Sequence, residues 1–149
     1  MPLKWVYKKF DVLEARELYA ILQLRNEVFV VEQNCVYQDA DGKDSPSIHL
    51  AGWDGDKLVA YCRIIPPGIS YPECSIGRVV CSPAYRRTGA GRALMTLAIE
   101  KAFHEFSGIS IKIGAQLYLK EFYASLNFIQ SGDQYLEDGI PHIEMQLKK

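Results

Sequence analysis

The segment from Ile76 to Ala102 constrains the fold most, because it joins a strand-like run to a helix-like run through a basic turn with two glycines. The strand-like part is apolar and ends before Pro83, and the helix-like part begins near Arg92. Glycines permit a tight turn and bring backbone N–H groups close to a ligand. A helix that begins there directs its positive end at the same point. The segment therefore predicts an anion-binding site, with a phosphate or diphosphate as the best fit.

The spacing of the glycines separates this turn from two common phosphate-binding loops. No Gly-Lys-Ser/Thr follows, which excludes a Walker A loop, and Leu94 stands where the dinucleotide fingerprint needs its third glycine. What remains is Arg-x-x-Gly-x-Gly from Arg86 to Gly91, with further positive charge on Arg87 and Arg92. An ordinary strand-to-helix turn with a solvated basic face has the same pattern, so the turn alone leaves both interpretations open.

The bulk properties predict a single domain over residues 1–149, with 48% hydrophobic and 23% charged residues. A net charge of −1 gives no general support for a nucleic-acid partner. The apolar runs are shorter than the roughly 18 residues of a membrane span, and the N-terminus lacks a signal-peptide layout. The four cysteines show no Cys-x-x-Cys spacing and the three histidines are scattered. We therefore expect a cytoplasmic protein with reduced thiols and no metal site.

Hydrophobic periodicity along the chain predicts a mixed α/β arrangement. Strands are expected over residues 3–10, 48–53, 58–65, 74–81, 109–115, 128–136 and 143–147, and helices over residues 13–29, 92–106 and 117–126. Asp11 is expected to cap the first helix, and Asp54-Gly55-Asp56 to form a hairpin turn. The order βαβββαβαββ implies a mixed sheet with helices packed on its faces.

Several segments together carry a resemblance to a known family. They are residues 24–44, 76–80, 86–91, 122–128 and 137–142. In combination they resemble the ElaA-type branch of the GCN5-related N-acetyltransferase (GNAT) family over nearly the whole chain. The element order is also that of the family. One departure is Asn127, where the family often has glycine; asparagine tolerates the left-handed conformation, so we expect the turn to survive.

The resemblance implies the GNAT fold, of class α/β (α+β mixed), with a mostly antiparallel twisted central sheet of about seven strands flanked by helices. It implies acetyl-CoA (coenzyme A) as cofactor, no metal, and acetyl transfer to a primary amine through a tetrahedral intermediate. The acceptor would be a small molecule or a peptide. The cofactor residues it implies are Val79, Val80, Cys81, Arg86, Arg87, Thr88, Gly89, Ala90, Gly91, Arg92, Phe122 and Tyr123.

Within that set, the resemblance gives two parts of the chain a catalytic role. The strand ending at residues 79–81 would splay from its neighbour and offer backbone N–H groups to the pantetheine arm and the oxyanion. Tyr123 would act as an acid near the cofactor sulfur, although its place on an apolar helix face also fits a core tyrosine. For the general base the sequence leaves open Glu32, Asp39, Asp41, His49, His142 and Glu144. Of these, His142 has a suitable ordinary pKa, and a water chain to Glu32 competes with it.

Two arginines stand inside apolar patterns and need partners. We expect Arg25 and Arg78 to join Glu32 and Asp41 in a network at the acceptor cleft, with Arg25, Asp41 and Arg78 binding substrate. A purely structural network that fixes a loop to the sheet is the alternative. The acidic loop at residues 39–44 fails the calcium-loop spacing. It is then either a solvated loop or an acidic rim that attracts a cationic amine.

Three other functions compete with the N-acetyltransferase interpretation. The first is a non-catalytic acyl-CoA-binding or sensing module, and the second is an acyl-homoserine-lactone synthase, a class that is usually longer. The third is a plain nucleotide-binding domain, against which the glycine spacing argues. Exposed edge strands leave room for a homodimer.

Overall fold

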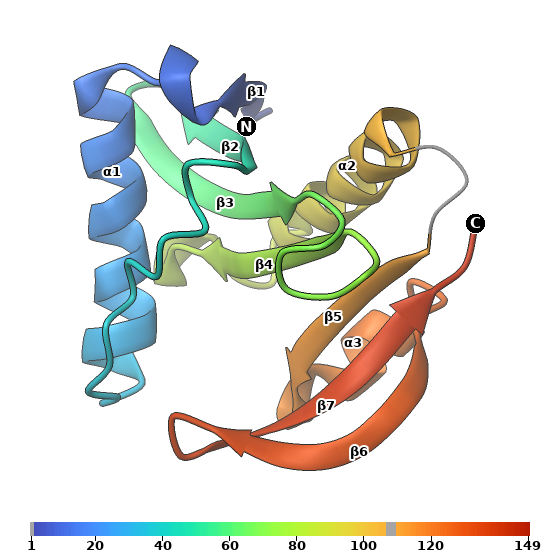
Figure 1. The fold of residues 1–149 in the computed structure, drawn as a ribbon. Coiled ribbons are helices and arrows are strands. Elements are labelled where there is room, and N and C mark those ends of the chain that lie inside the picture. Colours follow the sequence, from blue (N-terminus) through green and yellow to red (C-terminus); the bar gives the residue numbers. More distant parts are fainter. Residues whose placement is uncertain (1, 107–109) are drawn as a thin grey trace.

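The structure of the protein, a computed structural model, describes residues 2–106 and 110–149. Its described strands form two antiparallel sheets (Figure 1). The first sheet has the order β1-β2-β3-β4 and contains β1 (Lys4–Lys9), β2 (Ile48–Asp54), β3 (Lys57–Ile65) and β4 (Ser75–Cys81). The second has the order β5-β7-β6 and contains β5 (Ile111–Gln116), β6 (Ile129–Glu137) and β7 (Ile140–Leu147).

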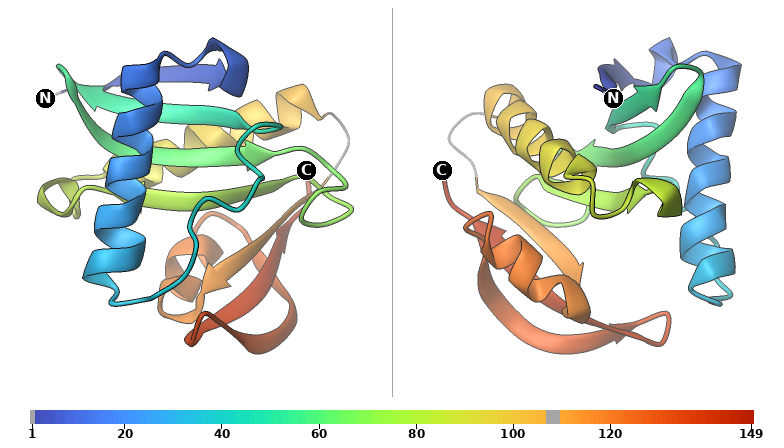
Figure 2. Two further views of the ribbon diagram at one scale, coloured as in Figure 1. Left: turned by 60° about the vertical axis from the view of Figure 1, so that its left-hand side comes forward. Right: turned by 180° about the vertical axis from the view of Figure 1, so that it is seen from behind.

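Helices cover both faces of the first sheet (Figure 2). Helix α1 (Ala15–Arg25) packs on one face, where Ile21 and Leu24 meet Tyr61 of β3. Helix α2 (Ala90–Glu105) packs on the other face, while α3 (Lys120–Ala124) lies against the second sheet. Because successive side chains of a strand point to opposite faces, Tyr61 faces α1 and Cys62 faces the α2 side. The expected seven strands are present, and they are divided between two sheets.

The two sheets meet where β4 and β5 begin. An isolated parallel bridge pairs Cys74 with Ile111, and the N–H of Lys112 donates to the carbonyl of Cys74 at 3.0 Å. Beyond the bridge the two strands diverge in a V (Figure 1). From Ser75 onward β4 pairs only with β3, so its inner edge faces the V. The expected splaying of this strand from its neighbour is present.

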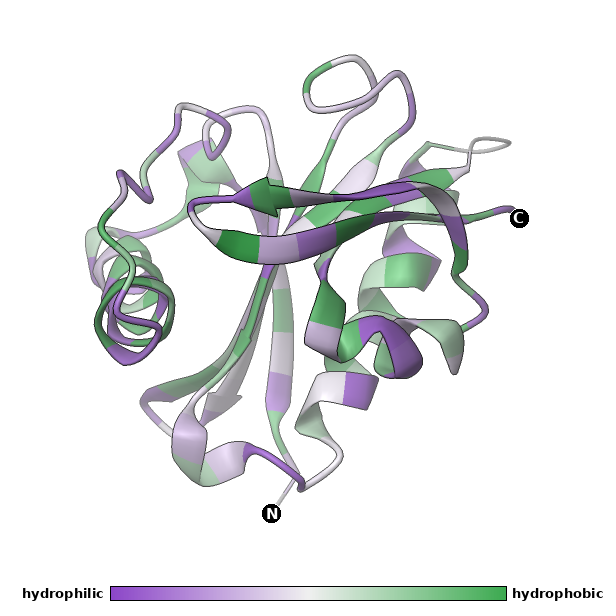
Figure 3. Ribbon diagram, turned by 90° about the horizontal axis from the view of Figure 1, so that it is seen from below, coloured by the Kyte–Doolittle hydropathy of each residue, from purple (hydrophilic) through white to green (hydrophobic). Residues whose placement is uncertain are grey.

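The second sheet has one apolar and one polar face. Hydrophobic and hydrophilic residues alternate along its strands (Figure 3). On β7, Ile143 and Met145 are buried in the core, whereas Glu144 and Gln146 occupy the intervening positions and are partly exposed. The core therefore lies on the side of α3, and the other face of the sheet is left for polar side chains.

The first helix differs most from the sequence prediction. It begins at Ala15, and Glu14 caps it through a reciprocal capping box with Glu17. Asp11 instead lies in a short 3-10 turn, Phe10–Val12, so the prediction that it caps the helix is wrong. Beyond Arg25 the chain continues as a π-helix, η2 (Asn26–Glu32). The hydrophobic periodicity predicts one continuous α-helix over this segment. It does not detect the change to a π-helix, because the wider π turns also place apolar residues in the core.

The remaining boundaries differ only at the ends. The predicted helix over residues 117–126 is a 3-10 turn, Leu117–Leu119, followed by the short α3. Residue 109, expected to start a strand, lies outside the described residues. Asn127 has φ +75°, so the predicted left-handed turn is confirmed. Gly55 at the β2–β3 hairpin has φ +60°. None of the helices in the described ranges is long and apolar enough to cross a membrane.

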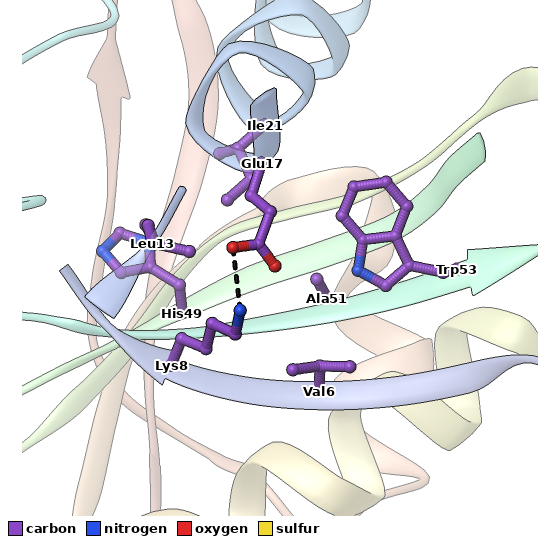
Figure 4. Close-up of a pocket in the computed structure, with 8 residues that line it drawn as sticks. All are labelled: Val6, Lys8, Leu13, Glu17, Ile21, His49, Ala51 and Trp53. Atoms are coloured by element: carbon purple, nitrogen blue, oxygen red, sulfur yellow. Dashed lines mark hydrogen bonds and ion pairs between the residues drawn. The ribbon is translucent and has the colours of Figure 1, made fainter. Parts of the chain in front are cut away.

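A small pocket lies between α1 and the strands β1 and β2 (Figure 4). At about 10 Å³ it holds at most one water molecule. Lys8 and Glu17 form an ion pair at 2.9 Å across it, and His49 and Trp53 form part of its wall. The pocket is a packing feature and is too small for a metabolite.

His49 is buried and both ring nitrogens are engaged. Its Nδ1 accepts a hydrogen bond from the Tyr61 hydroxyl at 2.7 Å, and its Nε2 donates to the carbonyl of Asp44 at 2.9 Å. Burial lowers the pKa of His49, although the backbone hydrogen bond and charge of Asp44 oppose this. The imidazole is thus neutral in the folded protein at neutral pH, and it is unavailable as a catalytic base.

The buried neutral imidazole predicts a pH-dependent stability. As the pH falls below about 6.5, the unfolded chain protonates His49 first. The full stability is therefore present above that pH and is lost below it, by at most about 1.4 kcal/mol per pH unit. Urea unfolding between pH 7.5 and 5.5 measures this loss. His49→Gln should remove it and the exposed His104→Gln should not; a wild-type stability that stays constant over this range contradicts the prediction.

Candidate active site

The basic turn forms the start of α2 next to the end of β4. Gly89 is the N-cap of α2 with φ +88°, a conformation that glycine adopts without strain. The first helical N–H with a partner is that of Ala93, which donates to Gly89 at 3.0 Å. The N–H groups of the first helical turn before Ala93 are left without intrahelical partners and point out of the helix. This is the geometry that binds a phosphate.

Contacts with neighbouring residues hold the side chains of Thr88 and Arg92 in place. The Thr88 hydroxyl donates to the carbonyl of Tyr85 at 2.6 Å. Arg92 donates to the Ser125 hydroxyl at 2.8 Å, and its guanidinium lies over the ring of Phe122, 5.6 Å from the centroid. Arg92 and Phe122, two predicted cofactor residues on different helices, therefore lie together.

Arg86 has a different environment from the other cations of the turn. Both of its terminal nitrogens donate to the carboxylate of Glu32 at 2.6 Å, so the turn is tied to the end of η2. The hydrogen bond and charge of Arg86 hold the pKa of Glu32 below its ordinary value. A carboxylate with a lowered pKa is a weaker proton acceptor, which disfavours Glu32 as the base.

The inner edge of β4 contains a bulge next to the V. Tyr61 pairs with Val80 and Arg63 with Gly77, so β4 holds one more residue than β3 over this stretch. Arg78 lies in the bulge with φ +51°, a strained value for a side-chain-bearing residue. Bulges redirect backbone groups and side chains beside active sites. Here the bulge directly precedes residues 79–81, the predicted donors to the thioester.

Tyr123 lies on α3 with 5% of its surface exposed. Its ring packs edge-on against Phe122 and Phe128. Burial, followed by the nearby Cys62, Tyr118 and Cys81 groups, raises the pKa of Tyr123 well above its ordinary value. Its hydroxyl is protonated at neutral pH, as it would be at the ordinary pKa of tyrosine, and the raised pKa makes it a weaker proton donor.

His142 lies at the start of β7 and is largely buried. Its Nδ1 donates to the carbonyl of Ile140 at 2.7 Å, and its ring stacks on Tyr135. Its Nε2 lies 3.6 Å from a carboxylate oxygen of Glu137. With Nδ1 protonated, a neutral His142 presents the lone pair of Nε2, as a base requires.

A buried network of alternating charges connects the loop after η2 to the first sheet. Its members are Arg25, Arg63, Arg78, Asp39, Asp41 and Asp44. Arg25 is fully buried and lies 2.7 Å from both Asp39 and Asp44. Burial alone would raise the pKa of Asp44, but hydrogen bonds and charges from Arg25 and Arg63 bring it below its ordinary value.

The network corrects two sequence expectations. Glu32 is not a member, because it pairs with Arg86, and Arg63 takes a place that the sequence analysis did not assign. Its signal was available, since Arg63 is a lone charge in the apolar run at residues 58–65. The acidic loop is exposed at residues 40–42, but it is not a free acidic rim, because each of its three aspartates pairs with an arginine.

The same pairings narrow the list of candidate bases. Asp39 and Asp41 are held by arginines, and Glu144 lies 3.7 Å from Lys112. His49 is enclosed and Glu32 is paired in the structure without cofactor, whereas His142 keeps an Nε2 that lies 3.6 Å from Glu137, so His142 stays a candidate base.

Two tyrosines that the sequence analysis did not single out lie on that polar face. The hydroxyls of Tyr71 and Tyr135 meet above Gly114, where an added Cβ would collide with the Tyr135 hydroxyl and lie 3.2 Å from that of Tyr71. Lys112 lies over the ring of Tyr71. No signal in periodicity identifies these residues, because the loop that carries Tyr71 reaches the sheet only in the fold.

Comparison with known proteins decides the family. The sequence matches the model of the acetyltransferase (GNAT) domain over residues 15–149. The chain belongs to the GNAT acetyltransferase family. Among the described residues of this GNAT protein, no group of three His, Cys, Asp or Glu side chains is placed to hold a metal ion, and all four cysteines are free thiols.

The relatives of this GNAT protein include the ElaA branch. It is 43% identical to protein ElaA of Escherichia coli over 96% of this chain and 95% of that protein. It is 44% identical to a UPF0039 protein of Synechocystis over 97% of this chain and 95% of that protein. An acyl-CoA N-acyltransferase structure from Pseudomonas aeruginosa superposes with a TM-score of 0.92 at 42% identity, covering 97% of this chain and 98% of that one.

The buried network predicts that Arg25 is needed for stability. Arg25→Ala removes the fully buried cation between Asp39 and Asp44 and leaves each with one arginine, Arg78 or Arg63, so we expect the free energy of unfolding to fall by about 3 kcal/mol. Urea denaturation measures it, with the exposed Arg16→Ala as a control that should change it by less than about 0.5 kcal/mol. A loss of turnover at unchanged stability would instead assign Arg25 to the acceptor site.

Proposed function

We propose that the protein is an acetyl-CoA-dependent N-acetyltransferase that acts on a primary amine of a small molecule or a peptide. The observation that carries this proposal is the V between β4 and β5, where the free inner edge of β4 leads directly to the N-terminus of α2. A free strand edge can hydrogen-bond to an amide-containing arm, and a helix N-terminus can bind a diphosphate. A long ligand with both parts would therefore fit the two elements together. Coenzyme A has both parts.

The residues present fit this cofactor. Gly89 has no side chain at the start of α2, and the first-turn N–H groups there are free to hold a diphosphate. Arg86, Arg87 and Arg92 with Thr88, Ala90 and Gly91 would surround the phosphates, and residues 79–81 and Phe122 would line the arm. An aminoglycoside 6'-N-acetyltransferase solved with coenzyme A shares the fold, with a TM-score of 0.71 at 20% identity.

The bound cofactor would supply an acetyl group activated as a thioester. The N–H groups of residues 79–81, beyond the bulge, would hold the negative charge that develops on the acetyl oxygen. Tyr123 would donate its hydroxyl proton to the departing sulfur. His142 Nε2 would accept the proton from the amine, directly or through water.

Two alternative functions remain beside the N-acetyltransferase proposal. A non-catalytic acyl-CoA-binding module would bind the cofactor without turnover. The acyl-homoserine-lactone synthase BjaI shares the fold with a TM-score of 0.79 at 14% identity, and this chain covers 83% of it.

Calorimetry tests the cofactor assignment. Acetyl-CoA and CoA should bind more tightly than ATP, because only they have the arm that fits the strand edge. Gly89→Ala places a Cβ at φ +88°, which costs roughly 1–2 kcal/mol and shifts the turn away from this conformation, so CoA binding should weaken about tenfold. The exposed Gly68→Ala, also at positive φ, is the matched control. Absence of CoA binding to the wild type would refute the proposal.

Thiol release over a panel of amines tests catalysis. Tyr123→Phe removes only the hydroxyl, so we expect kcat to fall about 10- to 100-fold with CoA affinity unchanged. The exposed Tyr19→Phe should have no effect. Unchanged kcat in Tyr123→Phe would leave this residue a packing role, and binding without release on any amine would favour the sensing module.

A further inference from the structure

The ion pair between Glu32 and Arg86 joins the two sides of the candidate site. It is bidentate, with two nitrogen–oxygen distances of 2.6 Å, and each side chain is about two-fifths exposed. Arg86 stands three residues before the N-cap Gly89, within the turn that holds the cofactor diphosphate in the proposed function. Glu32 is the last residue of η2, on the side of the charge network.

The pairing removes one positive charge from the turn. Of its three arginines, Arg86 is neutralised by Glu32, and Arg92 lies against Phe122 and Ser125. Arg87 is exposed and, within the described part of the chain, takes part in no ion pair. Both terminal nitrogens of Arg86 donate to the carboxylate of Glu32. They cannot donate to a phosphate in the same way while this ion pair exists.

We propose that Glu32 is a built-in competitor of the cofactor diphosphate for Arg86, and that cofactor binding moves the guanidinium from the carboxylate to the phosphate. The proposal rests on the proposed function, which places the diphosphate at this turn. A diphosphate bears more charge than a carboxylate and also meets the N–H groups of α2, so it wins Arg86 when present. Because Glu32 holds Arg86 in the ligand-free protein, the affinity of the turn for the cofactor is lower than it would be without Glu32.

The exchange also loosens the end of η2. This end is attached to the rest of the site by the Glu32–Arg86 pair and by two weaker contacts beyond it. Gln33 and Gln116 join their amides at 3.4 Å, and the thiol of Cys35 donates to the carbonyl of Asp138 at 3.2 Å. Loss of the charged pair leaves these two side-chain contacts beside the core packing of Val28 and Phe29. We therefore expect cofactor binding to loosen this end of η2.

Calorimetry with CoA on Glu32→Gln tests the competition. The variant removes the charge and keeps the shape, so CoA should bind about two- to fivefold more tightly, as expected for loss of an exposed ion pair. Glu27→Gln, an exposed carboxylate on the same π-helix, should leave the affinity unchanged. In an Arg86→Ala background Glu32→Gln should bring no gain. The gain should also shrink at 0.5 M salt.

The outcomes distinguish this proposal from the proposed function. Equal or weaker CoA binding by Glu32→Gln overturns the competition and makes Glu32 a residue that holds Arg86 in place for the phosphate. Absence of CoA binding to the wild type overturns both proposals. Amide hydrogen exchange provides a second readout: residues 30–36 should exchange faster in the wild type with CoA than without it, and slower or equal exchange overturns the loosening.

Discussion

The buried network of three arginines and three aspartates is the interaction on which the site depends. It fixes the loop after η2 to β3 and β4, and Arg78 contributes to it from the bulge of β4. The cost of a left-handed backbone at Arg78 is offset by its ion pairs with Asp39 and Asp41. The same contacts therefore hold both the loop after η2 and the bulged part of β4. The three positive and three negative charges cancel. The network therefore adds rigidity without creating a net positive or negative electrostatic potential.

Local chemistry made a large part of the fold predictable. The strand, basic turn and helix at residues 76–102 depend on glycine, proline and periodicity, all of which act over a few residues. The turn at Asn127 followed from the tolerance of asparagine for positive φ. The burial of Arg25 and its need for partners followed from a charge on an apolar face. The π-helix was not predictable, because its apolar residues satisfy a helical pattern in either geometry.

The partners of the charged residues could not be read from the sequence. Glu32 and Arg86 are 54 positions apart, and nothing in spacing distinguishes Glu32 from the aspartates of the loop as a partner for Arg25. Arg63 was identifiable as a lone charge, but its two aspartates were not. The polar cluster around Gly114 needs a loop to fold over a sheet. In each case the missing information is which segments the fold brings together, and that is a property of tertiary packing.

The diverging strands have a consequence for the protein without ligand. Beyond the bridge at Cys74, the inner edge of β4 has no strand partner, and unsatisfied strand edges invite pairing with another chain. The bulge at Arg78 distorts this edge, so that a regular strand from a neighbouring molecule cannot continue the ladder along it. The irregularity beside the proposed cofactor site would thus also disfavour aggregation of the ligand-free protein.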